Sequence, residues 1–239
     1  QEITNFLYRP FDTRPIFYHR SLVWSMSYPI MKNVLHKPNL MLCTSRQLAS
    51  LPWRHSFVSN TIVDLCYLTN KTKEGNHVFP LYIYPEENEQ SANLFEEYKV
   101  KKSPNFSKEL ISELKLKLDF NFIEEGRGNL SDSFGPEDIF YYMYAIFYSP
   151  TFRIRYAQQL KINFPSLPVT SNKELFKKLV NLGNELINLH LLGNNPFDKS
   201  KTIFDDNLKW HIVIGGKITD QAEDWKVKEV RYEEKTKRV

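Results

Sequence analysis

Cysteine and glycine are scarce in this 239-residue chain, with two and eight residues respectively. Cys43 and Cys66 lie in apolar runs and are too few for a disulfide framework, so we expect both to be reduced core residues. So little glycine excludes collagen-like and linker-dominated organisation. The chain also lacks a signal peptide and any apolar run long enough to cross a bilayer, which predicts a cytoplasmic protein without membrane contacts.

Sequence motifs of catalysis and of metal binding are missing as well. The six histidines are scattered, no Cys/His pair has metal-ligand spacing, and no phosphate-binding, dinucleotide-binding or nucleophile-elbow motif occurs. Asn195-Pro196-Phe197 lacks the second proline of the Asn-Pro-Pro-Tyr motif, and Asp205-Asp206 with Lys209 has no upstream partner for a nuclease triad. We therefore expect no catalytic residue, no metal ligand and no cofactor in this chain.

The composition that remains is that of a globular protein. Hydrophobic residues make up 41% and charged residues 25%, with a high aromatic share of 14%. The net charge of +4 permits an anionic partner without requiring one.

Apolar residues recur every second position early in the chain and at helical spacing later, which predicts an α+β fold. Residues 1–84 are expected to be β-rich, and Pro80 assigns the run at 78–84 to a sheet edge. Residues 85–135 are interpreted as a polar linker with a short helix capped by Ser107, residues 136–192 as a helical subdomain, and residues 193–239 as a C-terminal β segment. The other early strands are expected at residues 3–8, 16–19, 40–44, 57–59 and 62–67.

We expect the packing centre at residues 134–168. A helix begins there with Pro136 at its first position and acidic residues in its first turn. Phe140, Tyr144 and Phe147 follow at helical spacing, and Pro150 ends the helix. Residues 151–160 predict a second, shorter helix that packs on the first along an aromatic seam.

The clearest helix is predicted at residues 171–192. Ser171 and Glu174 have the spacing of a capping box, and Gly193 suits the C-terminal cap. His190, at the edge of the apolar face, is interpreted as a structural histidine. The expected face is a line of leucines, Leu175, Leu179, Leu182 and Leu186, widened by Phe176, Val180 and Ile187.

Two connections and the tail complete the chain. The polar run at residues 85–102 predicts a surface excursion, and the glycines around Arg127 suit either an ordinary mobile loop or an approach to a phosphate. Gly215-Gly216 predicts a hairpin turn, and a phase change within residues 225–232 predicts a bulge. Because the chain begins without methionine and ends inside a β-like pattern, we expect a piece of a longer polypeptide.

Arginines on loops are the candidates for a binding surface. Residues 8–19 place Arg9 and Arg14 among aromatic rings, which suits phosphate or guanine contacts and base stacking, although Asp12 could instead pair with either arginine to hold the turn. Arg46-Gln47 follows a strand and combines side chains suited to guanine and adenine, although Arg46 could pair with a carboxylate and Gln47 be solvated. The candidate DNA-binding residues are Arg9, Arg14, His19, Arg20, Ser45, Arg46, Gln47, Asn60, Lys71 and Lys73.

Four segments together resemble a known family. They are YRPFDTRPIFYH (8–19), HSFVSNTIVDLCYLTN (55–70), VFPLYIYP (78–85) and the run at 134–168. In this order they are similar to the C-terminal part of type ISP restriction-modification enzymes, with similarity to type IIG enzymes over the first segments. The resemblance covers about residues 6–192.

The resemblance implies a target-recognition domain that reads double-stranded DNA. In such enzymes it follows helicase-nuclease and N6-adenine methyltransferase domains of the same bacterial polypeptide, which use ATP, Mg and S-adenosylmethionine. This chain lacks those upstream domains and is expected to be non-catalytic. Because the family continues past Val239, the C-terminal β segment is expected to be truncated.

Two other functions remain open. A protein-interaction module would bind through the aromatic helix pair and would expose tyrosine and phenylalanine. A divergent nuclease would cluster carboxylates in a pocket.

Overall fold

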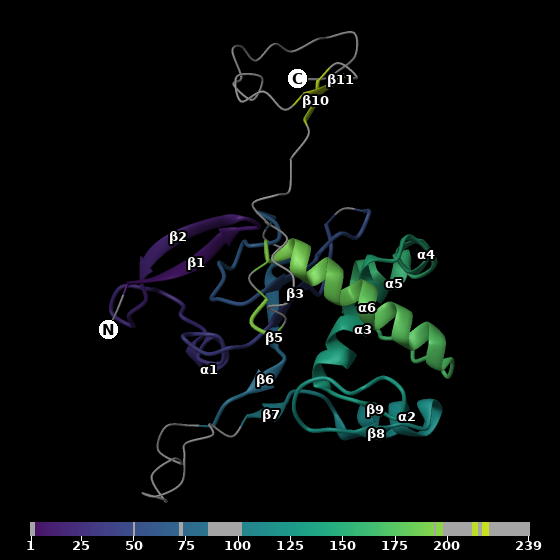
Figure 1. The fold of residues 1–239 in the computed structure, drawn as a ribbon. Coiled ribbons are helices and arrows are strands. Elements are labelled where there is room, and N and C mark those ends of the chain that lie inside the picture. The colour runs from purple at the N-terminus through teal and green to yellow at the C-terminus, as the bar shows by residue number, and fades with distance from the viewer. Residues whose placement is uncertain are drawn as a thin grey trace, which may run out of the picture. The chain divides into compact units, whose positions relative to one another are not determined.

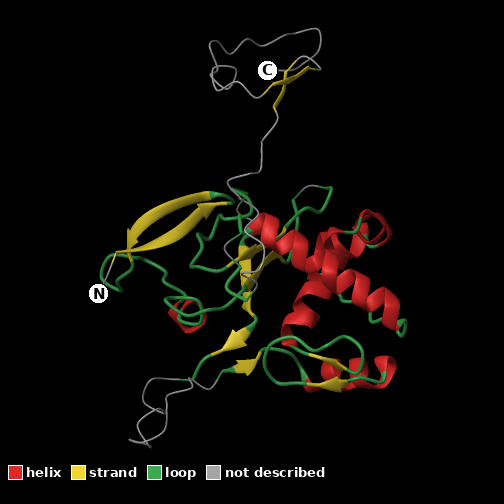
Figure 2. Ribbon diagram, in the orientation of Figure 1, coloured by secondary structure: helices red, strands yellow, loops and turns green. Residues whose placement is uncertain are grey.

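The computed structural model describes residues 3–49, 51–71, 74–85, 102–193, 195–197, 212–214 and 217–219. The chain divides into two compact units, Gln1–Ile203 and Phe204–Val239. The first unit combines helices with small, mostly antiparallel sheets (Figures 1 and 2), which confirms the predicted α+β class. Within the described ranges, no helix has both the length and the apolar character needed to cross a membrane.

The secondary structure elements are short, apart from two long helices. The strands are β1 (Ile3–Arg9), β2 (Asp12–Phe17), β3 (Met41–Ser45), β4 (Ser56–Ser59), β5 (Asn76–Pro80), β6 (Tyr82–Ile83), β7 (Ser103–Pro104), β8 (Asn121–Phe122), β9 (Ser133–Phe134), β10 (Ile212–Ile214) and β11 (Lys217–Thr219). The helices are α1 (Tyr28–Met31), α2 (Lys108–Leu118), α3 (Pro136–Tyr148), α4 (Pro150–Arg155), α5 (Ala157–Ile162) and α6 (Lys173–His190).

A three-stranded sheet in the order β4-β3-β5 forms the β part of the main core. All five residues of β3 are buried, and this strand pairs antiparallel with both neighbours. β5 lies at the edge of this sheet, as Pro80 predicts. The strand predicted at residues 78–84 is divided, because β5 ends at Pro80 and Tyr82–Ile83 form β6, which pairs with β7 instead.

The prediction of a strand at residues 62–67 is wrong. This segment makes only an isolated bridge, from Val63 to Leu7, and then turns. The carboxylate of Asp64 accepts a hydrogen bond from the amide of Cys66 at 2.8 Å, and such a local bond competes with strand pairing. The same turn leaves Cys66 half-buried, which corrects its expected place in the core, whereas Cys43 is buried as predicted.

An antiparallel hairpin, β1 with β2, precedes the sheet. β1 is confirmed, whereas β2 begins at Asp12, earlier than the predicted residue 16. Phe6 and Ile16 pack on a small cluster of buried residues that includes Met41 of β3, so one face of the hairpin is anchored to the sheet.

α3 is the centre of the main core, as its apolar sequence predicts. The exposed fraction of Tyr141, Tyr142 and Tyr144 is no more than 1%. The principal partner of α3 is α6 (Figure 1), because Gly183 lets the two backbones approach. A Cβ at Gly183 would lie 1.9 Å from the carbonyl oxygen of Tyr141. The predicted partner at residues 151–160 is instead divided at Tyr156 into α4 and α5, so the predicted helix pair is corrected to α3 with α6.

α6 departs from its prediction in its cap and in its buried face. The N-cap is Asn172, not Ser171, and its side chain accepts a hydrogen bond from the Leu175 amide at 2.9 Å. Leu175 and Leu182 are 45% and 57% exposed. The buried line consists of Phe176, Val180, Gly183 and Ile187, each one residue after a leucine of the predicted line. This line faces α3 because it contains Gly183, the glycine that allows the close contact. Gly193 takes a left-handed φ of 77° beyond the helix end, as the predicted cap requires.

A buried carboxylate holds the loop that precedes α3. Asp138 accepts hydrogen bonds from the amides of Gly128 at 2.6 Å and Gly135 at 2.9 Å, and from Nε of Arg127 at 3.1 Å. The loop around Arg127 is therefore held by Asp138, which corrects the mobile loop considered for it, and the guanidinium considered for a phosphate contact pairs with this carboxylate. Ser107 caps α2 as predicted, accepting a hydrogen bond from the Leu110 amide.

One hydrophobic cluster draws on the early strands, on α2 and on the later helices. It contains Leu42 of β3, Leu114 of α2, and the rings of α3 packed on Trp53 and Phe176. In the second unit, β10 and β11 pair antiparallel with Ile214 opposite Lys217, as the predicted hairpin requires. Residues 86–101 of the polar run and the predicted bulge at 225–232 lie outside the described residues.

Candidate nucleic-acid interface

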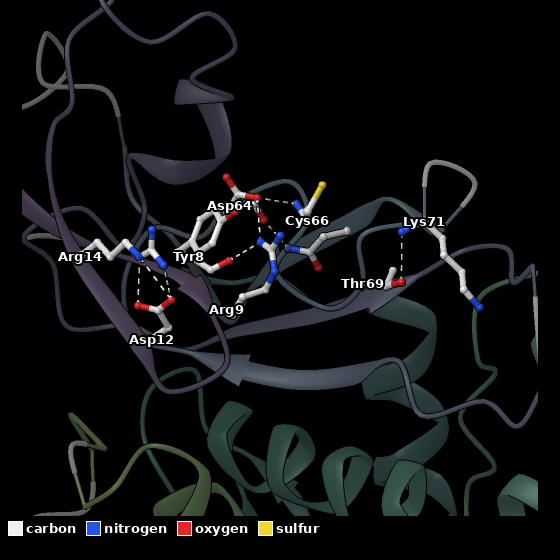
Figure 3. A network of polar contacts seen from close by, with 9 residues as sticks. Tyr8, Arg9, Asp12, Arg14, Asp64, Cys66, Thr69 and Lys71 are labelled. Carbon is white, nitrogen blue, oxygen red and sulfur yellow. Dashed lines mark hydrogen bonds and ion pairs between the residues drawn. The ribbon is translucent and has the colours of Figure 1, made fainter. Parts of the chain in front are cut away.

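The tip of the β1–β2 hairpin gathers two candidate arginines around one aromatic ring (Figure 3). The guanidinium carbons of Arg9 and Arg14 lie 4.1 and 4.0 Å from the centroid of the Tyr8 ring. Antiparallel pairing brings them together, and Phe11 closes the turn with a left-handed φ of 65°. Two cations beside an exposed hairpin turn could contact a phosphate backbone.

Both arginines also have carboxylate partners. Nη2 of Arg14 lies 2.8 Å from Oδ2 of Asp12, and this hydrogen bond lowers the pKa of Asp12 and raises that of Arg14. Nη1 of Arg9 lies 3.3 Å from Asp64. The pairing considered for Asp12 is thus found with Arg14, whose side chain stays 53% exposed.

A buried glutamate joins the loops at one end of the three-stranded sheet. Glu74 is 1% exposed, and its carboxylate accepts hydrogen bonds from the Ala49 amide at 2.7 Å and the Thr69 hydroxyl at 2.9 Å. Nε2 of His55 lies 3.2 Å from the same carboxylate, and the backbone carbonyl of Glu74 accepts from the hydroxyl of Ser45 at 2.8 Å. We call Glu74 with these four partners the Glu74 node.

The sequence analysis missed the Glu74 node. An acidic residue before a glycine and a strand is a common pattern, and nothing in it predicts that the carboxylate is buried. His55 has a lowered pKa because of burial, which outweighs the opposing effect of the Glu74 carboxylate. His55 is therefore neutral at pH 7 and contributes a hydrogen bond to the node.

Ser45, Arg46 and Gln47 have different environments although they are consecutive. Ser45 is the last residue of β3 and is fully buried opposite Asn76, so its predicted position on an exposed loop is wrong. Arg46 and Gln47 are exposed directly after the strand, as expected. Among the residues that the structure describes, neither side chain has a hydrogen-bond or ion-pair partner, so the carboxylate considered for Arg46 is not found there.

The remaining candidates lie in three other places. Lys71 is exposed on the loop that leads to Glu74 (Figure 3). Asn60 is half-buried after β4, at the opposite end of the sheet, beside a hollow of about 430 Å³. His19 and Arg20 follow β2 and line a hollow of about 980 Å³ with Trp24. Lys73 lies outside the described residues.

The structure thus brings the candidates together in part only. Arg9 and Arg14 share the hairpin tip, and Arg46, Gln47 and Lys71 border the Glu74 node. Asn60 lines a hollow together with Phe11 and Thr13 of the hairpin, whereas His19 and Arg20 line a different hollow.

The features expected for the two alternative functions lie inside the core. Of the aromatic rings of α3 that a protein-interaction module would present, all but the half-buried Tyr148 are buried. In the described ranges, no group of three or more His, Cys, Asp or Glu side chains could hold a metal ion. The neighbouring acids Glu137 and Asp138 are buried at the start of α3 and bonded to Tyr82 and to the preceding loop.

Comparisons with known proteins identify relatives. A family model described as the type ISP C-terminal specificity domain matches residues 1–239. No curated protein matches the chain.

Solved structures similar to the chain include three complexes with DNA or a DNA mimic. The cryo-EM structure of a DrdV–DNA complex has a TM-score of 0.58 and 21% identity, over 79% of this chain and 16% of that chain. The ATP-dependent type ISP restriction-modification enzyme LlaBIII bound to DNA has a TM-score of 0.55 and 23% identity, over 80% of this chain and 11% of that chain. A nuclease-deletion mutant of the type ISP restriction-modification enzyme LlaGI in complex with a DNA substrate mimic has a TM-score of 0.53 and 21% identity, over 79% of this chain and 14% of that chain. At these identities the likeness shows the fold alone. The chain matches only 11–16% of the length of these proteins.

Proposed function

Because the chain belongs to the family of type ISP C-terminal specificity domains, we propose that it reads the target sequence for a bacterial restriction-modification polypeptide. In this proposal the domain binds double-stranded DNA and directs the N6-adenine methyltransferase and the nuclease of the same polypeptide to the site. The domain itself is non-catalytic. S-adenosylmethionine, ATP and Mg bind to the other domains of the polypeptide, which acts in the cytoplasm, where its DNA substrate lies.

The observation that carries this proposal is the exposed pair Arg46-Gln47. The two side chains follow a buried strand, where a loop projects from the sheet, and no described residue pairs with either of them. An arginine can bind guanine with two hydrogen bonds, and a glutamine can do the same with adenine. Such a pair at a rigid strand end suits readout of base edges.

The proposed mechanism is contact with DNA, not chemistry. Cationic side chains bind phosphates and fix the register, while Arg46 and Gln47 reach base edges in the major groove. With the register fixed, the methyltransferase of the polypeptide can flip out the adenine at the right position. The proposed contacts, from which the buried Ser45 is withdrawn, are Arg9, Arg14, His19, Arg20, Arg46, Gln47, Asn60, Lys71 and Lys73.

The test uses the full-length polypeptide. A selection from random duplexes should first yield one preferred site; if no sequence preference is found, the proposal fails. Arg46→Ala should then cost about 1–3 kcal/mol of binding free energy and relax the preference at one base pair. A phosphate contact would instead weaken binding to all sequences alike.

Lys117→Ala is a matched control, because it removes an exposed cation that pairs with Glu113 on α2, away from the candidates. We expect this variant to keep both affinity and base preference. If Arg46→Ala also keeps both affinity and base preference, Arg46 does not contact DNA.

A further inference from the structure

The loop at residues 46–49 is held at both of its ends by one residue. On one side, the hydroxyl of Ser45 donates to the backbone carbonyl of Glu74 at 2.8 Å. On the other side, the amide of Ala49 donates to Oε1 of Glu74 at 2.7 Å. Ser45 is also fixed by its pairing opposite Asn76, so the end of β3 and the end of the loop share one anchor.

A second contact fixes the middle of the same loop. Leu48 is 7% exposed, and its amide donates to the carbonyl oxygen of Lys161 in α5 at 2.9 Å. Leu48 therefore points into the core, whereas Arg46 and Gln47 point to solvent. Three hydrogen bonds, from the Ser45 hydroxyl and from the amides of Leu48 and Ala49, hold this loop, and its exposed polar side chains are those of Arg46 and Gln47.

We propose that Glu74 is a positioning residue that holds this loop so that Arg46 and Gln47 meet DNA in one fixed register. The inference rests on the proposed function. A loop that is ordered before binding avoids the entropy cost of ordering on DNA, and it keeps each side chain opposite one base pair. A loosened loop would allow several registers, so discrimination between bases would fall.

The node depends on an acceptor atom of residue 74 placed opposite the Ala49 amide, and both oxygens of the Glu74 carboxylate are engaged. Oε1 receives the Ala49 amide, and Oε2 receives the Thr69 hydroxyl and faces His55. A glutamine at position 74 keeps one acceptor oxygen for Ala49 and offers an NH₂ group to the Thr69 oxygen, so it should preserve most of the geometry. An aspartate is one methylene shorter and withdraws the acceptor from Ala49.

The experiment measures binding of the full-length polypeptide to its selected site, to a scrambled duplex, and to every single-base variant of the site. Glu74→Ala should weaken binding to the site roughly 5- to 150-fold, as Arg46→Ala should, and should relax the same base pair. Binding to the scrambled duplex should stay unchanged. The double variant, Glu74→Ala with Arg46→Ala, should bind the selected site no more than about twofold more weakly than Arg46→Ala alone, because both changes remove the same base contact.

Two further variants separate positioning from general stability. Glu74→Gln should restore affinity to within about threefold of the wild type, because it can still accept from Ala49. Thr69→Val removes a hydrogen bond to the same carboxylate without affecting the Ala49 bond, and it should leave base preference intact. If Glu74→Ala does not fold, Glu74→Asp takes its place and should relax the same base pair.

Three results would overturn the inference. The first is unchanged base preference in Glu74→Ala or Glu74→Asp while Arg46→Ala relaxes it. The second is a Glu74→Ala variant that loses as much affinity for the scrambled duplex as for the selected site, or a Thr69→Val variant that relaxes base preference as much as Glu74→Ala does. Either outcome indicates that Glu74 has a structural role only. The third is an unchanged base preference in Arg46→Ala. This result would mean that Arg46 reads no base that Glu74 could position, but it would not contradict sequence recognition by the domain. Absence of any sequence preference in the wild type would instead refute the proposed function.

Discussion

Glu137 and Asp138 are consecutive acids with different electrostatic environments. Asp138 accepts hydrogen bonds from two amides and Arg127, which oppose the effect of burial on its pKa. Glu137 receives one hydrogen bond, from the Tyr82 hydroxyl at 3.3 Å, and burial raises its pKa to about 7. Glu137 can therefore make folding depend on pH near neutrality.

We predict that Glu137→Gln removes part of this pH dependence. The pKa of Glu137 is higher in the folded state than its ordinary value of 4.5, so its contribution to stability is complete below pH 4.5 and is lost as the pH rises through about 7. The loss is on the order of 3 kcal/mol, at roughly 1.4 kcal/mol for each pKa unit. Glutamine stays neutral throughout, so urea unfolding from about pH 4 to pH 8 should show a smaller fall in stability for the variant.

Glu124→Gln is the control, because Glu124 is exposed on the preceding loop. It should leave the pH profile unchanged. A Glu137→Gln profile that falls as steeply as that of the wild type would show that Glu137 is ionised in the folded protein.

At the scale of elements, the N-cap of α6 is Asn172 and not the predicted Ser171. The side chain of Asn172 accepts from the Leu175 amide, which leaves Ser171 outside the helix. We predict that Asn172→Ala lowers the free energy of unfolding by about 1 kcal/mol, whereas Ser171→Ala changes it by less than about 0.5 kcal/mol. Thermal unfolding of the two variants side by side measures this. The reverse order would restore Ser171 as the cap.

The contact between α3 and α6 depends on the missing side chain at Gly183. In an exposed helix, replacing glycine with alanine gains about 1 kcal/mol. Here the new Cβ would lie 1.9 Å from the carbonyl oxygen of Tyr141, so the helices must separate, and we predict that Gly183→Ala destabilises the fold by roughly 1–3 kcal/mol. Chemical denaturation gives the difference.

Gly75→Ala is the matched substitution for Gly183→Ala, since no atom lies within 4 Å of the position that its Cβ would take. It should be neutral within about 0.5 kcal/mol. A stabilising Gly183→Ala would mean that the two helices do not pack as closely as the structure shows.

At the scale of the whole molecule, the modest charge limits how tightly the isolated domain can hold DNA. Each neutralised phosphate contributes a slope of roughly −0.9 in log K against log salt. With a net charge of +4, few phosphates are neutralised, so we predict micromolar or weaker affinity at physiological salt, falling as salt increases. A titration of a labelled duplex across a salt series tests this. Tight binding that is independent of salt would contradict it.

The sequence by itself determined the features that depend on local chemistry. Pro136 begins α3 and Ser107 caps α2, because both effects act within one helical turn. Pro80 identifies an edge strand because it lacks an N–H. The α+β class follows from hydrophobic periodicity, and the exposed position of Arg46 and Gln47 follows from the end of a strand.

Only the tertiary structure decided which of several equivalent local patterns is used. The leucine line of α6 and the line through Gly183 are both helical stripes, and contact with Tyr141 selects the second. Ser45 and Glu74 are polar residues that sequence patterns place at the surface, yet pairing with distant segments buries both. Such burial depends on contacts between residues about 25 or more positions apart, and local propensity carries no information about them.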